Sequence, residues 1–204
     1  MRNRVQTAAA ITLLIAAAAF ATATVRFGTA TSTVSIKGTS TLHEWEMKGS
    51  TIRGSIDLSP ELVAATTPEA WTDTASRPVT VNVTIPVTSL RSQHGKMDTL
   101  MQEALKTKAN PEIRYQLTSA GILRGGTDTF VVRTRGKLTI AGVTRDVAMD
   151  VAAARQGDKS YVLTGETPIK MTEFGIKPPT AMLGTIRTGD QVKVAFRWTV
   201  DRAQ

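Results

Sequence analysis

The sequence predicts an all-β fold: an antiparallel, up-and-down β-barrel of about eight strands, with one amphipathic helix over its lumen. Three features carry this prediction. Apolar residues alternate with polar ones through most of the 204-residue chain, as they do in strands with one buried face. Short turns, many of them containing glycine, separate the alternating runs. A single segment, residues 95–106, has the spacing of a helix instead.

The alternating runs follow one another along the chain. The first three lie at residues 34–36, 41–49 and 52–58, and the clearest is 79–87, where five β-branched residues share one face. A connection rich in Thr and Ala, residues 58–78, comes before that run and has room for a helical turn at 60–65. The later runs lie at residues 113–117, 130–140, 147–151, 161–163 and 191–200. So many apolar faces must cover a second sheet or close on themselves.

The predicted helix favours a barrel over a sandwich. Its apolar stripe consists of Met97, Leu100, Met101, Ala104 and Leu105. Over the open end of a barrel this stripe can face the lumen, whereas on a sandwich the helix would be an appendage. Methionines suit an irregular or changing contact surface, and they are also ordinary core residues. The pattern alone leaves open whether the lumen holds a ligand or is filled by side chains.

The N-terminus has the features of a secretory signal peptide. Two arginines precede an uncharged, Ala-rich run that reaches Ala23, and Ala21-Thr22-Ala23 matches a small-x-small cleavage site. No cysteine follows, which excludes a lipoprotein anchor. An uncleaved membrane anchor is the alternative, but the run is weakly apolar for that role. We therefore predict a signal peptide at 1–23 and one domain over 24–204.

Composition narrows the classes of function. The chain has no cysteine, which excludes disulfides, cysteine catalysis and thiolate metal sites. Its net charge of +8 is spread thinly, without a compact basic cluster or interleaved aromatic residues, so nucleic acid is not an expected partner. A basic protein can be drawn to anionic lipid head groups, but ordinary solubility accounts equally well for this charge.

Four segments, taken in order, resemble the YceI-like family, whose domain is also called polyisoprenoid-binding or lipid-binding. They are GTSTLHEWEMKGSTIRGSIDL (38–58), IPVTSLRSQHGKMDTLMQEALKTKANPEIRYQLTSA (85–120), RGKLTIAGVTRDVAMDV (135–151) and MTEFGI (171–176). The most specific parts are the helix-plus-strand block KMDTLMQEALKTKANPEIRYQL, the hairpin GKLTIAGVTRDV and MTEFGI. The resemblance covers residues 33–201 and includes no catalytic signature.

The resemblance implies a lipocalin-like barrel that is exported to the periplasm. Its lumen would hold a long isoprenoid lipid, of polyprenyl phosphate or quinone type, for transport, storage or a stress response. Burial of each CH₂ unit gains about 0.8 kcal/mol, so an apolar lumen suffices for binding. The lipid or quinone is then the ligand, with no covalently bound cofactor. A homodimer and transient contact with the inner membrane are further expectations.

The residues expected to line the lumen come from the helix, the early strand 41–49, the late segment MTEFGIKPPTAML and the last strand. They are Trp45, Met47, Met97, Leu100, Met101, Leu105, Met171, Phe174, Ile176, Met182 and Phe196. A phosphate head group would need cations at the mouth, and Arg91, Lys96 and Lys177 lie next to these residues in the sequence. The tryptophan-plus-Asp stretch followed by His-Ser that usually opens the family's sequences is missing, and His43 stands in TLHEWEM instead.

Two other functions remain as alternatives. His43 and His94, with carboxylates near them in the sequence, could form the metal site of a hydrolase. However, no HExxH motif, Ser/His/Asp motif or phosphate-binding glycine loop accompanies them, and on a strand over 41–47 His43 would point away from its two Glu neighbours. The second alternative is an interaction or stress module whose lumen is filled by its own side chains. We predict no enzymatic activity, no catalytic residue and no metal site.

Overall fold

The computed structural model describes residues 24–64, 79–126, 128–157 and 159–203. The signal peptide predicted at 1–23 and most of the connection predicted at 58–78 lie outside these ranges. The helical turn expected at 60–65 lies inside them up to residue 64 and is observed there as α1 (Pro60–Ala64).

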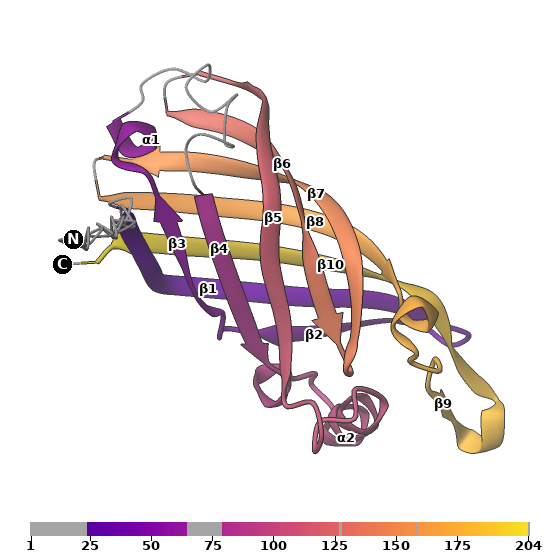
Figure 1. Ribbon diagram of the computed structural model, residues 1–204. Coiled ribbons are helices and arrows are strands. Elements are labelled where there is room, and N and C mark those ends of the chain that lie inside the picture. The colour runs from indigo at the N-terminus through magenta and orange to yellow at the C-terminus, as the bar shows by residue number, and fades with distance from the viewer. Residues whose placement is uncertain (1–23, 65–78, 127, 158, 204) are drawn as a thin grey trace, which may run out of the picture.

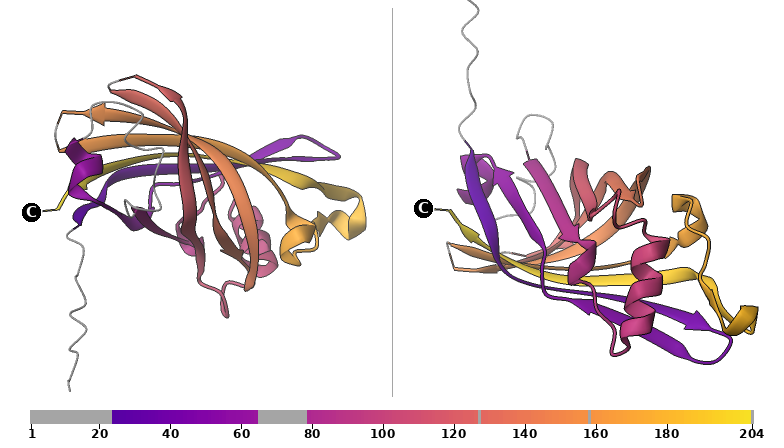
Figure 2. Two further views of the ribbon diagram at one scale, coloured as in Figure 1. Left: turned by 45° about the horizontal axis from the view of Figure 1, so that its top comes forward. Right: turned by 90° about the horizontal axis from the view of Figure 1, so that it is seen from below.

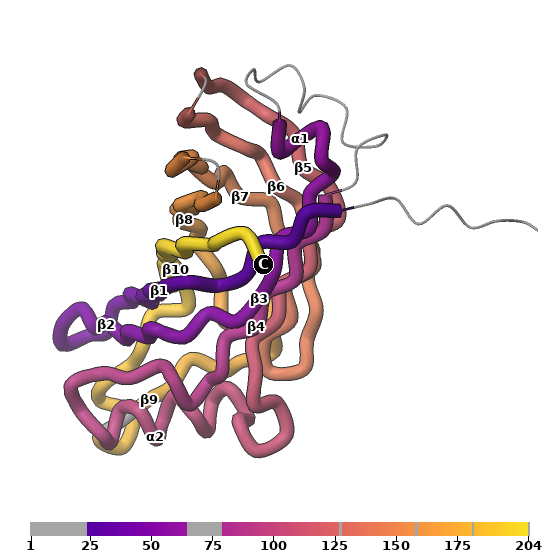
Figure 3. Tube along the Cα trace, turned by 90° about the vertical axis from the view of Figure 1, so that its left-hand side faces the viewer, coloured from indigo at the N-terminus to yellow at the C-terminus, as the bar shows by residue number. Residues whose placement is uncertain are grey.

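Eight strands form a closed antiparallel barrel (Figures 1 and 3). Each strand pairs with the next in the order β1-β3-β4-β5-β6-β7-β8-β10, and the pairing of β1 with β10 closes the ring. The eight are β1 (Val25–Ser40), β3 (Arg53–Leu58), β4 (Val79–Pro86), β5 (Glu112–Gly125), β6 (Thr129–Ile140), β7 (Val143–Gln156), β8 (Ser160–Lys170) and β10 (Ile186–Arg202). The all-β barrel predicted from the alternating pattern is therefore confirmed.

Two short strands are added to this ring at one end. β1 changes partner along its length: its residues 25–28 pair with β3, and its residues 34–39 pair with β2 (Glu44–Gly49). β9 (Thr180–Ala181) pairs with the start of β10. The β1–β2 hairpin and the β9–β10 hairpin therefore extend the wall at the end of the barrel opposite the C-terminus (Figure 1).

The first two strands differ from their predicted bounds. β1 begins at Val25 rather than Val34, because a run of Gly, Thr, Ala and Ser with a register shift between Thr29 and Thr31 hides its alternation. β2 begins at Glu44 rather than Thr41. The Ser40 N–H and hydroxyl both donate to the carbonyl of His43, at 2.9 and 2.8 Å, and make a turn there. His43 consequently lies in the turn and not on the strand.

A cluster of buried hydrophobic side chains lies toward the end of the barrel near the C-terminus. α1 lies at this end, where Leu62 is completely buried and the Arg155 Nη2 donates to the carbonyl of Val63 at 2.8 Å (Figure 1). Beneath α1, the rings of Phe27 and Tyr161 meet edge-on with centroids 5.2 Å apart. Phe27, Leu62 and Tyr161 belong to one cluster of buried hydrophobic residues.

The remaining helices lie toward the end of the barrel opposite the C-terminus (Figure 1). α2 (Gly95–Ala104) runs across the barrel, and it is the helix predicted at 95–106 (Figure 2). The short 3₁₀ turns are η2 (Val87–Ser89), which leads toward α2, η3 (Met171–Phe174), after β8, and η4 (Met182–Gly184), between β9 and β10.

Candidate ligand-binding lumen

The interior of the barrel contains a cavity of about 360 Å³. All eight barrel strands contribute to its lining, together with β2, α2 and η3. Among the lining residues that the structure describes, none carries a charge, and Thr134, Thr167 and Thr188 are the small polar members. The volume lies within the range of small-molecule sites, roughly 300–1,000 Å³. The lumen is thus not filled by its own side chains, in contrast to the interaction-module alternative.

Ten of the eleven residues predicted to line the lumen do line this cavity. They come from β2, α2, η3 and the segment after it, and β10. Met182 is the exception and corrects the prediction: its side chain is 70% exposed. The reason is the turn η4, which projects beyond β9 and takes a left-handed backbone at Met182, with φ of 51°.

The apolar stripe predicted for the helix faces the lumen. The cavity is lined by all five stripe residues: Met97, Leu100, Met101 and Ala104 of α2, and Leu105, which caps its C-terminal end. The segment before the helix is fixed to β2, because the backbone N–H groups of Lys48 and Arg91 each donate to the other residue's carbonyl, at 2.7 and 2.8 Å. α2 therefore forms one wall of the lumen rather than a separate surface element.

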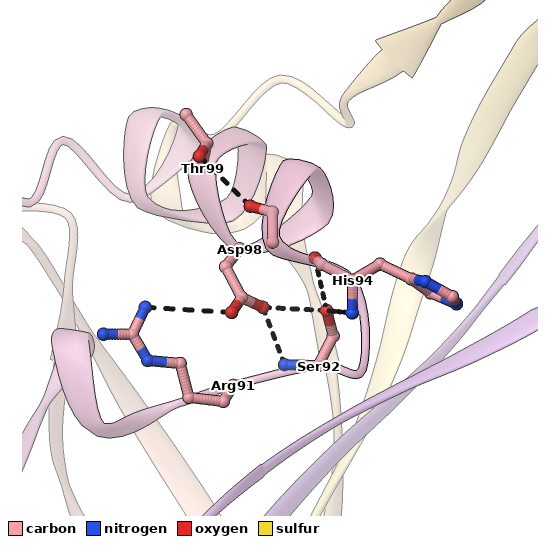
Figure 4. Close-up of polar contacts among 6 residues, drawn as sticks. Arg91, Ser92, His94, Asp98 and Thr99 are labelled. Atoms are coloured by element: carbon pink, nitrogen blue, oxygen red, sulfur yellow. Dashed lines mark hydrogen bonds and ion pairs between the residues drawn. The ribbon is translucent and has the colours of Figure 1, made fainter.

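A buried carboxylate holds α2 to the segment that precedes it (Figure 4). Asp98 lies in the first turn of the helix with only 8% of its surface exposed. The Ser92 N–H donates to its Oδ1 at 2.7 Å, and the Ser92 hydroxyl donates to the same oxygen at 2.8 Å. These two hydrogen bonds hold the pKa of Asp98 below its ordinary value, and the bond from the backbone N–H has the larger effect. Burial of the carboxylate acts in the opposite direction.

The three cations predicted at the mouth do not line the cavity. The guanidinium of Arg91 lies 3.7 Å from Asp98 Oδ2, so this side chain is directed to the base of α2. Lys96 and Lys177 are exposed. A role for these three residues in binding a head group stays a prediction.

One polar atom stands out in the apolar lining. The hydroxyl of Tyr115, on β5, is buried and has no hydrogen-bond partner of good geometry among the described residues. Burial raises the pKa of Tyr115, and the nearby Thr134 hydroxyl offsets this in part. Thr134 directs its own proton to the carbonyl of Met149 at 3.1 Å. The Tyr115 hydroxyl therefore keeps its own proton to donate, either to the Thr134 oxygen or to an acceptor in the lumen.

A model of the YceI-like domain matches residues 26–200. The chain belongs to the YceI-like family. Among curated proteins, it is 33% identical over 104 residues to Protein YceI of Escherichia coli O17:K52:H18, and 32% identical over 104 residues to Protein YceI of Shigella flexneri. Each match covers 48% of this chain and 52% of the relative, so it spans about half the length of these relatives.

Three solved structures share the YceI-like fold of this chain. BcnA of Burkholderia cenocepacia superposes with a TM-score of 0.59 at 19% identity, covering 82% of this chain and 95% of BcnA. A polyisoprenoid-binding domain from Saccharophagus degradans gives 0.63 at 13% identity, with coverage of 87% and 98%. The YceI protein of Campylobacter jejuni gives 0.56 at 18% identity, with coverage of 78% and 85%. At these identities the likeness concerns the fold.

The histidines of this YceI-like chain are engaged separately and outside the cavity lining. His43 Nδ1 lies 2.7 Å from the carbonyl of Glu44. His94 directly precedes α2, and its backbone N–H donates to the Ser92 hydroxyl at 3.0 Å. Within the described ranges, no group of three or more His, Cys, Asp or Glu residues is placed to hold a metal ion. No helix in those ranges combines the length and the apolar character needed to cross a membrane.

Many of the residues that line the cavity were not predicted from the sequence. The lining also includes Tyr115, Phe130, Met149 and Trp198, together with the inward faces of β4 and β8. The signal was the alternation itself, since the apolar faces of the alternating runs supply much of the lining. The same alternation describes a strand that packs into a solid core, so it could not separate lining from core.

Proposed function

We propose that this protein is an exported carrier that holds an isoprenoid lipid in the lumen of its barrel. The observation that carries the proposal is the uncharged, apolar cavity, which α2 bounds on one side. A neighbour in fold is described as a polyisoprenoid-binding domain, and the signal-peptide pattern at residues 1–23 supports export to the periplasm. Transport or storage of the lipid follows from holding it away from water.

The lining explains how an isoprenoid would bind. A prenyl chain offers only apolar surface, and each buried CH₂-sized unit contributes about 0.8 kcal/mol. Valine, isoleucine, leucine, methionine and aromatic side chains surround the cavity, so a flexible chain meets van der Waals partners on all sides. Methionines on α2 and η3 can adjust to chains of different shape.

The lack of charged side chains in the described lining indicates which polar head group the lumen can accept. A phosphate inside the lumen would be buried without a cation, because no charged side chain lines the described part of the cavity. A neutral acceptor, such as the carbonyl of a quinone, can accept a hydrogen bond from the Tyr115 hydroxyl. Of the two ligand types expected, the quinone type therefore suits the lumen better, and a polyprenyl phosphate would keep its head group outside it.

Tryptophan fluorescence tests this function, because Trp45 and Trp198 line the cavity. A quinone with a short isoprenoid tail is titrated into the protein, with Trp71 replaced by Phe throughout to remove its background. We expect saturable quenching with one quinone per chain. Quenching that does not saturate, or that depends only on bulk quinone concentration, would overturn the proposal.

Two alanines on β7 provide a matched pair of variants. Ala153 is buried and lines the cavity, whereas its neighbour Ala152 is exposed on the outer face. Ala153→Phe places a ring in the lumen, and Ala152→Phe places the same ring outside. We expect the first to weaken quinone binding at least about tenfold and the second to leave it unchanged, since a displaced ligand loses several buried CH₂ units. Equal affinities of the two variants would show that the quinone binds elsewhere.

A further inference from the structure

We infer that the end of the barrel opposite the C-terminus is a docking tip that inserts into the surface of a lipid bilayer. The tip consists of Leu42, Met182 and Leu183. The inference rests on the proposed function, because a carrier of a membrane lipid must come into contact with the membrane. Leu42 is 68% exposed, Met182 is 70% exposed and Leu183 is fully exposed. Of the four large apolar side chains that are exposed in the described ranges, these three lie at this end.

Hydrogen bonds join the two turns that carry the tip. Leu42 lies in the turn between β1 and β2, and Met182 and Leu183 lie in η4, between β9 and β10. Thr41 connects them: its N–H donates to the carbonyl of Arg187 at 3.0 Å, and its hydroxyl donates to the carbonyl of Thr185 at 3.2 Å. The Arg187 N–H returns a hydrogen bond to the Thr41 hydroxyl at 3.2 Å. The apolar side chains are therefore presented by one connected structure.

The backbone of η4 takes an unusual conformation to present them. Met182 and Leu183 have φ of 51° and 55°, in the left-handed region that residues with a Cβ rarely adopt. Neither side chain gains a packed contact in return, because both are exposed. Backbone strain that no internal packing offsets is typical of residues that make a contact with another molecule.

The lumen reaches the base of this tip. Thr188, which lines the cavity, pairs with Ser40 beside the first turn, and its N–H donates to the carbonyl of Pro179, another lining residue, at 3.1 Å. Trp45, a third lining residue, donates from Nε1 to the carbonyl of Thr39 at 3.1 Å. A bilayer that accepted the tip would therefore lie next to residues that line the cavity.

The size of the tip favours a bilayer over a protein partner. A stable protein interface uses roughly 20–30 residues a side, far more than three aliphatic side chains. Insertion of a few apolar side chains between lipid head groups gives weak and reversible attachment instead, as a shuttle requires. The strands next to the two turns carry Arg187, on β10, and Glu44, on β2, which have opposite charges. Insertion should therefore depend mainly on apolar contact and little on salt.

Vesicle flotation tests the inference. The protein and the double variant Met182→Asn/Leu183→Asn are each incubated with vesicles of phosphatidylcholine, alone or mixed with phosphatidylglycerol. Asparagine tolerates the left-handed backbone, so this variant is expected to fold and melt like the parent. Leu123→Asn is the control, because Leu123 is 44% exposed but lies on β5, away from the tip. We expect the double variant to lose vesicle affinity at least about tenfold and the control to keep it.

The quinone titration described above separates this inference from the proposed function. A double variant that still quenches with quinone but no longer floats supports the tip. Vesicle binding without any quinone binding by the parent protein also supports the tip, while it overturns the carrier function. A parent protein that does not float, or a double variant that floats equally well, overturns the tip whatever the quinone result. A double variant that changes only the oligomeric state in sedimentation overturns it too, because the tip would then be a contact between copies of the chain.

Discussion

At the scale of single residues, the Tyr115 hydroxyl is the polar feature that sets this lumen apart from a plain apolar core. A buried hydroxyl without a well-aligned partner among the described residues lowers the free energy of unfolding of the ligand-free protein, because it has lost its hydrogen bonds to water. A ligand with a neutral acceptor would restore one of them. The same atom therefore has opposite effects on the free energy of unfolding and on the affinity for a ligand.

Tyr115→Phe tests this residue directly. The variant removes the hydroxyl and keeps the ring, so we expect a melting temperature equal to or above that of the parent and a quinone affinity lower by about three- to tenfold. Calorimetry and fluorescence titration measure the two quantities. A fully saturated hydrocarbon chain without a carbonyl is the control ligand, and its affinity should not change. A lowered melting temperature with unchanged quinone affinity would mean that the hydroxyl has a structural partner instead.

Asp98 is the second residue with a separable role. Its carboxylate accepts the N–H and the hydroxyl of Ser92, so its charged form is favoured in the folded protein. A lowered folded pKa means that the contribution to stability is present above the ordinary carboxyl pKa, about 3.9, and is lost as the pH falls through the lowered value. The attachment of α2 should therefore be stable at neutral pH and weaken in acid.

Asp98→Asn keeps the shape of the side chain and removes its charge. We expect faster amide hydrogen exchange in residues 95–105, with the protection of the barrel strands unchanged, because the carboxylate holds only the base of α2. In the parent protein this protection should fall as the pH drops below about 4, whereas in the variant it should vary little with pH. Asp146→Asn is the matched control, since Asp146 is a largely exposed partner of Lys137. Equal protection of α2 in parent and variant would contradict this role of Asp98.

At the scale of elements, α2 is the part of the molecule whose position the sequence predicted best. Its five apolar positions were identified from their spacing, and all five line the cavity. The spacing sufficed because no other described segment of this β protein has a helical stripe of that length. η4 could not be predicted in the same way, because a short turn has no period, and Met182 was misplaced for that reason.

A double variant of α2 tests its contact with the ligand. Leu100→Ala/Met101→Ala removes two lining side chains without breaking the helix, since alanine favours helices. We expect quinone affinity to fall at least about tenfold, because each lost side chain removes buried apolar contact. Glu103→Ala, on the exposed face of the same helix, should have no effect. If the double variant binds quinone as tightly as Glu103→Ala does, α2 is not part of the binding site.

At the scale of the whole molecule, the barrel was predictable and its cavity was not. Alternation along β4 and β10 shows which side chains point inward, and the helix favours closure over a sandwich. Neither feature reports whether inward side chains from opposite walls meet. The structure shows that some of them meet, as the rings of Phe27 and Tyr161 do, and that a cavity which both of these rings line remains inside the barrel. That difference depends on how far apart the strands lie, which a linear pattern does not contain.

The central claim is that this cavity holds an isoprenoid lipid in the exported protein. The most direct test is native mass spectrometry of the protein purified from the periplasm without detergent, followed by organic extraction of whatever is bound. We predict a chain of residues 24–204 with an additional mass that extracts as an isoprenoid quinone or another polyprenyl lipid. A bare chain of that mass, unchanged after incubation with isoprenoid quinones and polyprenyl phosphates, would contradict the account.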